Sequence, residues 1–392
     1  MAVLALVLGI SALGVGAGGM PWADDESAAA DGYPLRVERP YVVRELPARP
    51  GALAGLLKSS DGSWMAVSPH GRVWELADED DRFEVFPALS ADGRILAYLR
   101  TSKDGFGEYV IRNLKTGVLT AYPELSSSAT GSDATFWIAP QQPAHLSPGG
   151  DQVLLQGGRA DGRNADALVL SEDGGVRELF VAGPVFPAGW LPDGRIAWLA
   201  QPDGFLEPTR SPEIVVTTDT GVEEGRARLH LTRPMDLSQW SMRISPDGTS
   251  IALAEDAGPA RTVAIVPSGD WREQDRWDVA ADTVLGGCLT SWRDEQPMVS
   301  TTTGLAPPDP SEAPVLAADP RLQVGCSVWA QQAIDGDAHQ GLSGDLFDTS
   351  DSWWAWRWRE VAAAILLVVA VAGLWWARRR LRPEPEVQTL DE

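Results

Sequence analysis

Four histidines are the first candidates for chemistry, because imidazole transfers protons near neutral pH and can ligate zinc. They are His70, His145, His230 and His339. No two of them stand four residues apart, and the His-Glu-x-x-His pattern of zinc hydrolases is absent from the sequence. We therefore interpret each histidine as a surface or turn residue, and we expect neither a metal nor another cofactor.

The sequence also lacks the motifs of nucleophilic and phosphate chemistry. No Gly-x-Ser-x-Gly occurs, and neither a P-loop nor a Gly-x-Gly-x-x-Gly follows a strand-like segment. The acidic run DEDD at residues 78–81 does not alternate as an EF-hand loop does, so we interpret it as a solvated turn. The sequence thus predicts a protein that is not an enzyme.

The two cysteines, Cys288 and Cys326, each follow a glycine and stand 38 residues apart. Both lie in a part of the chain that we expect to be exported, where thiols oxidise. We predict a Cys288–Cys326 disulfide, which would stabilise the fold by about 3–4 kcal/mol on the loop-entropy estimate. The alternative is a pair of buried free thiols.

The C-terminal part of the sequence has the pattern of a membrane anchor. Residues 361–377 carry no charge and would span roughly 25 Å as a helix. Tryptophans flank this run on both sides, as at membrane interfaces: Trp353, Trp354, Trp356, Trp358, Trp375 and Trp376. A basic cluster follows, and it predicts a cytoplasmic C-terminus: Arg378, Arg379 and Arg380. We expect a single transmembrane α-helix over 353–377 and a cytoplasmic tail over 378–392.

The remaining flanks have recognisable compositions. Residues 1–23 contain an apolar run without a basic start, and we interpret them as a signal peptide or an N-terminal signal anchor. Residues 24–39 are predicted to be a linker, and the Gly-, Asp- and Ser-rich residues 336–352 a flexible stalk. The intervening residues 40–335 would therefore lie outside the cell membrane.

A short phrase recurs in this region, a turn followed by an apolar strand. Four copies carry the Asp-Gly pair: Asp61-Gly62, Asp92-Gly93, Asp193-Gly194 and Asp247-Gly248. Two copies depart from it, because the one at Gly149-Gly150 lacks the aspartate and the last one, near Asp294, lacks the glycine. Successive turn glycines are 31, 57, 44 and 54 residues apart. Asp can cap such a turn and Gly can take its left-handed position. Apolar strands repeated at about this period are typical of propeller blades.

The Ser-Pro-Asp-Gly phrase, complete at Ser245 to Gly248, resembles the WD-like repeat of TolB-type β-propellers. The resemblance covers about residues 40–335 and implies an all-β propeller of about six blades, with five and seven as alternatives. Closure is expected to involve residues 321–333, pairing with the segment around residues 41–43. Most tryptophans outside the anchor are expected in blade cores, with one or two on a binding face: Trp64, Trp74, Trp137, Trp190, Trp198, Trp240, Trp271 and Trp329.

The function that these patterns favour is a membrane-anchored, extracytoplasmic module that binds an envelope protein, peptide or polymer. The net charge of −23, from 55 acidic and 32 basic residues, argues against a nucleic-acid partner. Two alternatives stay open. One is a lyase, cyclase or glycan hydrolase that uses acidic residues in the central channel, and the other is a sensory subunit that signals through a membrane partner.

Overall fold

The computed structural model describes residues 32–38, 43–59, 62–76, 86–101, 107–123, 125–126, 136–138, 143–159, 166–183, 185–200, 208–236, 240–257, 260–279, 282–319, 322, 324 and 326–339. These residues belong to one compact unit, which spans 1–39 and 43–343. The second unit, residues 40–42 and 344–392, lies outside the described residues. The predicted signal segment, transmembrane helix, tail and most of the stalk therefore also lie outside them.

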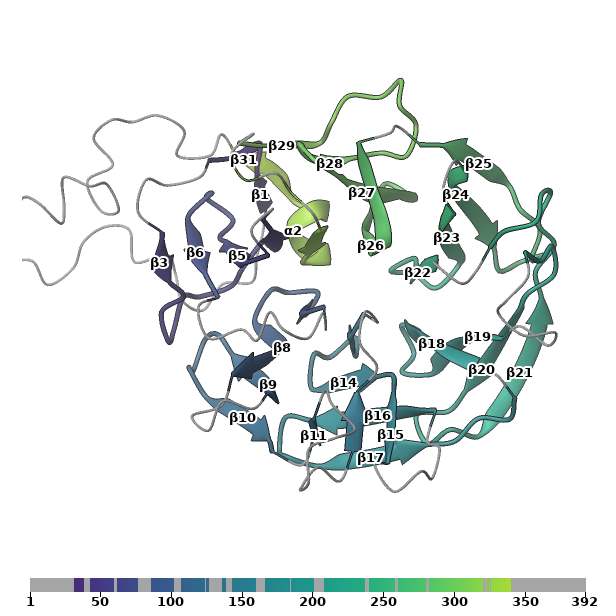
Figure 1. Ribbon diagram of the computed structural model, residues 1–392, viewed down its shortest axis with the longest axis horizontal. Helices are drawn as coiled ribbons and strands as arrows, with labels where there is room; N and C mark the ends of the chain where they lie inside the picture. Colours follow the sequence, from purple (N-terminus) through teal and green to yellow (C-terminus); the bar gives the residue numbers. More distant parts are fainter. Residues whose placement is uncertain are drawn as a thin grey trace, which may run out of the picture. The chain divides into compact units, whose positions relative to one another are not determined.

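Six sheets, antiparallel except for one parallel edge strand in each of two, form the blades of a propeller, which Figure 1 shows as a ring. Blade 1 contains β30 (Cys326–Trp329), β4 (Gly55–Lys58), β5 (Trp64–Val67), β6 (Val73–Glu75) and β3 (Arg44–Glu45). Blade 2 contains β7 (Ala88–Leu89), β8 (Ile95–Thr101), β9 (Gly107–Asn113) and β10 (Leu119–Tyr122). Blade 3 contains β13 (His145–Leu146), β14 (Gln152–Leu155), β16 (Ala167–Ser171) and β17 (Val176–Leu179).

The second half of the ring repeats this order. Blade 4 contains β18 (Val185–Trp190), β19 (Ile196–Ala200), β20 (Glu213–Thr217) and β21 (Glu223–Arg228). Blade 5 contains β22 (Trp240–Ile244), β23 (Ser250–Ala257), β24 (Ala260–Pro267) and β25 (Asp275–Asp278). Blade 6 contains β26 (Thr283–Arg293), β27 (Gln296–Thr301), β28 (Gly304–Ala306), β29 (Leu316–Ala318) and β2 (Arg36–Val37). The prediction of six blades is confirmed.

Strands from both ends of the described chain close the ring. The late strand β30 pairs antiparallel with β4, with Val328 opposite Leu56. The early strand β2 pairs parallel with β29 at the edge of blade 6. The expectation that residues 321–333 complete a blade with an early strand is confirmed, but the partner named for them, the segment around residues 41–43, is wrong. The partner is β4, whose apolar run is buried on both faces.

Short elements complete the unit. The strands β11 (Leu125–Ser126), β12 (Phe136–Ile138) and β15 (Gly157–Arg159) form a small sheet beside blade 3. The strand β1 (Gly32–Pro34) pairs with β31 (Asp337–His339), and α2 (Gln331–Asp335) follows β30 directly. Among the described residues, no helix is long and apolar enough to cross a membrane.

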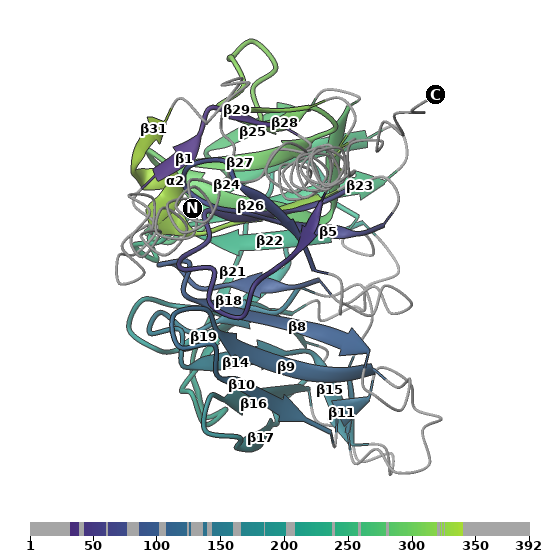
Figure 2. The ribbon, with the colours of Figure 1, turned by 90° about the vertical axis from the view of Figure 1, so that its left-hand side faces the viewer.

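The middle of each blade is buried on both faces, which explains why its second strand is mostly apolar. In β8, Leu96 and Tyr98 pack towards blade 1, whereas Ala97 and Leu99 pack towards blade 3. This division follows from the two-residue repeat of a strand. Figure 2 shows β8 and β9 lengthwise, crossing the thickness of the ring. The hairpin turns that precede these second strands consequently gather at one end of the ring.

Candidate functional site

The repeated turns have a common hydrogen-bond pattern that fixes the exit of each first strand. The hydroxyl of Ser90 donates to Asp92 at 2.6 Å and accepts from the backbone N–H of Ile95 at 2.9 Å. Ser245 bonds to Asp247 and accepts from the N–H of Ser250 in the same way. Because both partners of the hydroxyl are local, these serines and aspartates are explained by turn formation.

The turn glycines have the left-handed conformation that the phrase requires. Their φ angles are 94° at Gly62, 72° at Gly93, 86° at Gly194 and 73° at Gly248. Asp193 accepts from the backbone and side chain of Arg195, and Asp61 lies outside the described residues. In the copy at residues 147–151, Gly149 stands in place of the turn aspartate. There the carboxylate of Asp151 accepts the hydrogen bond from the Ser147 hydroxyl instead, at 2.8 Å.

The first strands of all six blades line one central cavity, of about 270 Å³, at the end of the ring where the turns lie. The wall residues from these strands are Ala88, Leu89, His145, Leu146, Ala188, Gly189, Trp190, Arg243, Ile244, Ser291, Trp292, Val328 and Trp329. Turn residues such as Ser147 and Pro246, together with Gln331 of α2, complete the lining. The described lining residues include no Asp and no Glu.

His145 and Arg243 meet across this cavity. They lie in blades 3 and 5, and a guanidinium nitrogen of Arg243 is 3.2 Å from Nδ1 of His145. Gly189, in the intervening blade, leaves the space for this contact, because a Cβ there would lie 3.2 Å from the same Nδ1. A side chain at position 189 would therefore displace the imidazole.

The protonation of His145 follows from this contact. Arginine has only donors, so Nδ1 accepts and the proton of the neutral ring sits on Nε2. Burial and then the charge of Arg243 lower the pKa of His145 to about 3, although the Pro187 carbonyl acts in the opposite direction. Burial lowers the pKa of Arg243 to about 10. At neutral pH the cavity thus contains a neutral imidazole beside a cation.

Four polar atoms of the wall are buried without a hydrogen-bond partner among the described residues. They are His145 Nε2, Ser291 Oγ, Trp292 Nε1 and Trp329 Nε1. His145 itself is only 6% exposed. Buried polar groups are nearly always paired in folded proteins. Single atoms of this kind also occur elsewhere in the described core, at Tyr109 and Ser241, whereas four of them line this one cavity.

Neighbouring residues hold these groups in place. The side-chain amide of Gln331 donates to the carbonyl of Trp292 at 2.7 Å and to Asp335 at 2.8 Å, which ties α2 to β26. The ring of Trp329 lies over Gly55, where a Cβ would come within 2.5 Å of it. The indole of Trp190 donates to the carbonyl of His145 at 3.1 Å.

Two further cavities adjoin the central one and are acidic. One, of about 490 Å³, is lined by five carboxylates: Asp247, Asp275, Asp294, Glu295 and Asp335. The other, of about 570 Å³, contains Asp151, Asp193, Asp219 and one cation, Arg195. Burial raises the pKa of Asp335, and its hydrogen bond from Gln331 opposes this. Each of these two cavities shares lining residues with the central one, so the three cavities are neighbours.

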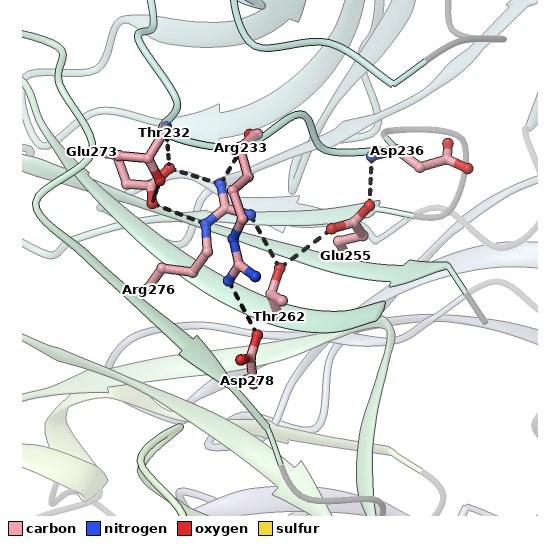
Figure 3. A network of polar contacts seen from close by, with 8 residues as sticks. All are labelled: Thr232, Arg233, Asp236, Glu255, Thr262, Glu273, Arg276 and Asp278. Atoms are coloured by element: carbon pink, nitrogen blue, oxygen red, sulfur yellow. Dashed lines mark hydrogen bonds and ion pairs between the residues drawn. The ribbon is translucent and has the colours of Figure 1, made fainter. Parts of the chain in front are cut away.

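A second polar cluster lies in blade 5 and the loop before it (Figure 3). Arg276 contacts Glu273 at 2.7 Å, with side chains that are 6% and 3% exposed. Glu273 also accepts from the backbone N–H of Thr232 at 2.9 Å, and Arg233 pairs with Asp278 at 3.1 Å. Burial would raise the pKa of Glu273, but the hydrogen bonds from Arg276 and Thr232 outweigh it and hold that pKa below its usual range. The cluster fastens a loop to a blade.

The other predicted residues fall in several places. Cys326 is buried in β30 and is not a free thiol, whereas the side chain of Cys288 in β26 lies outside the described residues. The anchor tryptophans and arginines lie outside them as well. Within the described part of the chain, no group of three His, Cys, Asp or Glu side chains could hold a metal ion.

The expectation that every histidine is a surface or turn residue is wrong for His145. His70 and His230 are exposed, and the side chain of His339 is not described. The tryptophan prediction is confirmed for Trp64, Trp74, Trp198 and Trp329, which are buried. Trp190 and Trp271 are half-buried, and the side chains of Trp137 and Trp240 are not described.

Sequence reasoning missed the wall of the cavity, although a positional signal exists. Ala88, His145, Gly189 and Arg243 each stand two residues before the first residue of a turn phrase, and each lines the cavity. The residue two positions before each turn varies between the copies, and it is this residue that identifies the cavity wall in the sequence.

No protein-family model matches the sequence, and no curated protein matches it. Among solved structures, TolB from Acinetobacter baumannii is 15% identical, with 72% of this chain and 67% of that chain covered and a TM-score of 0.41. A TolB structure from Agrobacterium tumefaciens is 15% identical over 60% and 80%, with a TM-score of 0.37. Hydrazine synthase of Kuenenia stuttgartiensis is 11% identical over 73% and 78%, also with 0.37. The assignment as a six-bladed propeller rests on the strand pairing of the chain itself.

Proposed function

We propose that this chain is an extracytoplasmic propeller, anchored in the cell membrane, that binds a basic polypeptide at the end of the ring where the repeated turns lie. The observation that carries the proposal is the group of three neighbouring cavities: two of them are lined by carboxylates, and the central one, which we call the floor, is lined by hydrogen-bond donors. A concave site of this kind can enclose an extended polypeptide, which a flat surface cannot do.

Charge supports a basic partner. The chain carries a net charge of −23, and five carboxylates line one of the side cavities. Such a field attracts cationic segments and raises their association rate, with an effect that salt screens. The same charges repel acidic segments, which gives the face a basis for selection.

Binding, and not catalysis, is the role that we propose for the polar groups of the floor. A general base works best when its pKa is near the working pH. The pKa of His145 is lowered to about 3, far below neutrality, by burial and by Arg243. An imidazole in this state is suited to hydrogen bonding and poorly suited to proton abstraction.

The proposal is tested by the binding of labelled peptides to the full-length protein in detergent, measured by fluorescence anisotropy. We expect an alternating Lys-Ala peptide to bind at least tenfold more tightly than the matching Glu-Ala peptide. The affinity should fall as salt rises. Equal affinities for both peptides, or no binding of either, would contradict the proposal.

A matched pair of variants locates the binding face. Asp294→Asn with Glu295→Gln removes two charges from the side cavity and should weaken the lysine peptide several-fold. Asp309→Asn with Glu312→Gln removes two charges from a loop of blade 6 that lines none of the three cavities, and should have little effect. The same loss in both variants would mean that only the net charge matters.

The proposed membrane topology rests on the tryptophans and arginines around residues 361–377. A reporter fused after Glu392 should be active only in the cytoplasm, and protease added to intact cells should digest the propeller. Protection of the propeller from external protease would refute this topology.

The proposed Cys288–Cys326 bridge would join two strands that contact each other, β26 and β30. Both strands line the central cavity, so the bridge would also fix its wall. Mass spectrometry of unreduced peptides from membrane-derived protein should find the linked pair. Two alkylatable thiols in that sample would show that the bridge does not form.

A further inference from the structure

We infer that the acidic cavity of about 490 Å³ binds an arginine side chain of the polypeptide in preference to lysine. This inference rests on the proposed function, because it names the residue of the partner that enters one of the three cavities. We call this cavity the blade 5–6 cavity, since blades 5 and 6 and α2 supply its lining. Three observations carry the inference: carboxylates without counter-charge, an aromatic wall, and a buried donor without a partner.

The blade 5–6 cavity has more negative charge than its surroundings balance. The described residues that line it include five carboxylates, no Lys and no Arg. Arg293, which is not among the lining residues, pairs with Asp294 at 3.7 Å. Within the described part of the chain, Asp275, Glu295 and Asp335 form no ion pair within 4 Å. Burial raises the pKa of Asp335, and the charge of Asp294 adds to this rise. A bound cation would relieve that repulsion.

Trp277 supplies an aromatic wall that suits a planar cation. It stands two residues after Asp275 in β25, so both side chains lie on the same face of the strand. Trp277 is half-buried and packs against a core cluster that includes Trp292 of blade 6, which fixes its ring. A guanidinium can stack on an indole while its edge donates to a carboxylate, whereas an ammonium is a compact point charge. The pairing of ring and carboxylate therefore favours arginine.

The spread of the acceptors favours arginine as well. Asp275 lies on β25, Glu295 in the turn between β26 and β27, and Asp335 at the end of α2. A guanidinium has five N–H donors in one plane and can pair with two carboxylates at once. An ammonium has three donors on one atom, so it reaches fewer of these separate acceptors.

A buried donor indicates that a polypeptide backbone accompanies the side chain. Trp292 lines both the blade 5–6 cavity and the central cavity, and it is 3% exposed. Its Nε1 has no hydrogen-bond partner among the described residues. An indole N–H can only donate, and the backbone carbonyls of an extended chain are acceptors. A chain that passes from one cavity to the other would supply this acceptor.

The turn that presents Asp294 and Glu295 has an unfavourable backbone conformation. It is a two-residue hairpin loop between β26 and β27, with φ angles of 47° and 67°. Glycine and asparagine are the usual residues at such positions, and a Glu with positive φ is disfavoured. Glu295→Gly should therefore raise the Tm and weaken the arginine peptide. A purely structural role for Glu295 would not give a more stable protein that binds less tightly.

The first test compares three labelled probes on the full-length protein in detergent, by fluorescence anisotropy at fixed salt. They are Arg-Ala-Arg-Ala, Lys-Ala-Lys-Ala, and the arginine peptide with both guanidinium groups dimethylated. The arginine peptide should bind about tenfold more tightly than the lysine peptide. Dimethylation keeps the charge but blocks bidentate pairing, so it should lower the affinity to that of the lysine peptide. Equal affinities of the arginine and lysine peptides would overturn the inference.

Variants of the cavity make the test specific. Asp275→Asn should reduce the preference for arginine several-fold. The matched control is Asp278→Asn, because Asp278 lies on the same strand and lines none of the three cavities. Trp277→Leu removes the stacking ring and should weaken the arginine peptide alone. Asp275 is exposed, so its variant keeps the inference testable if Trp277→Leu does not fold.

The outcomes separate this inference from the proposed function. If the arginine and lysine peptides bind equally, and both weaken in Asp294→Asn with Glu295→Gln, the arginine preference is refuted while the binding face remains. If neither peptide binds, the proposed function itself fails. A preference for arginine that Asp275→Asn reduces and Asp278→Asn preserves supports the inference.

Discussion

Two polar clusters of this propeller differ in how their hydrogen bonds are satisfied. In blade 5, the buried Glu273 accepts from Arg276 and Thr232, and the charges of Arg276 and Glu273 balance. In the central cavity, His145, Ser291, Trp292 and Trp329 present polar atoms that lack a hydrogen-bond partner among the described residues. The side chains of Glu273 and Arg276 are nearly inaccessible, and His145 is buried too, so exposure of these groups does not explain the difference.

The difference separates a structural network from a binding site. A network in which every group is paired can hold a loop in place, and its hydrogen bonds are stronger because the surroundings have a low dielectric constant. Donors that stay unpaired cost stability, typically about 1–3 kcal/mol each. A wall that keeps several of them is explained if a ligand supplies the acceptors.

The largest expected effect is the loss of stability when the Glu273–Arg276 ion pair is broken. Glu273→Gln leaves the buried Arg276 without its counter-charge, and it should destabilise the protein by about 3–5 kcal/mol. The control is Glu223→Gln, since Glu223 is an exposed partner of Arg226 and should change stability by at most about 1 kcal/mol. Urea unfolding of both variants gives the comparison. A loss below about 1 kcal/mol for Glu273→Gln would mean that the network does not fasten the loop.

A smaller effect is expected where the cavity wall is packed. Gly55→Ala places a methyl group within 2.5 Å of the Trp329 ring, and it should cost about 1–3 kcal/mol and weaken peptide binding. Gly225→Ala is the control, because a Cβ there meets no atom within 4 Å. Thermal unfolding and anisotropy measure the two effects. Unchanged binding by Gly55→Ala would show that the position of Trp329 does not matter to the ligand.

The pH dependence sharpens the role of His145. Its folded pKa of about 3 lies below the unfolded value of about 6.5, so the unfolded state binds more protons between these values. Stability is therefore full above about pH 6.5 and falls as the pH drops towards 3, by about 2 kcal/mol at pH 5. His145→Asn should remove this loss, whereas exposed His230→Gln should retain it. Parallel pH profiles for wild type and His145→Asn would contradict the buried neutral state.

The smallest effect differs in sign between the clusters. Ser291→Ala removes an unpaired hydroxyl and should be neutral or stabilising by up to about 1 kcal/mol. Thr262→Val removes a hydroxyl that contacts Glu255 and Arg276, and should destabilise by about 1 kcal/mol. Chemical unfolding of the two variants measures the difference. Destabilisation by Ser291→Ala would place that hydroxyl among the structural groups.

The repeat predicted the fold because its turn residues and apolar strands are local features. Ser245, Asp247 and Gly248 make the same local contacts as Ser90, Asp92 and Gly93, so their pattern is visible in the sequence. The partner of β30 was not visible in this way, because pairing Val328 with Leu56 closes a ring over some 270 residues.

The binding wall could not be predicted from types and motifs. His145 and Arg243 are 98 residues apart, and neither belongs to a catalytic or metal-binding pattern. They meet because the ring brings one position of each blade to the same axis, and because Gly189 leaves room between them. Periodic position, and not residue type, carried the information about the site.

The most direct measurement is the NMR signal of the indole N–H groups in full-length protein labelled with ¹⁵N-tryptophan. Trp292→Phe and Trp329→Phe assign the two cavity signals, and Trp198 is an internal reference because its N–H already donates to Thr217 at 2.9 Å. We expect the Trp292 and Trp329 signals to move with the alternating Lys-Ala peptide, to saturate, and to stay in place with the Glu-Ala peptide. Unmoved cavity signals at saturating Lys-Ala peptide would contradict the account.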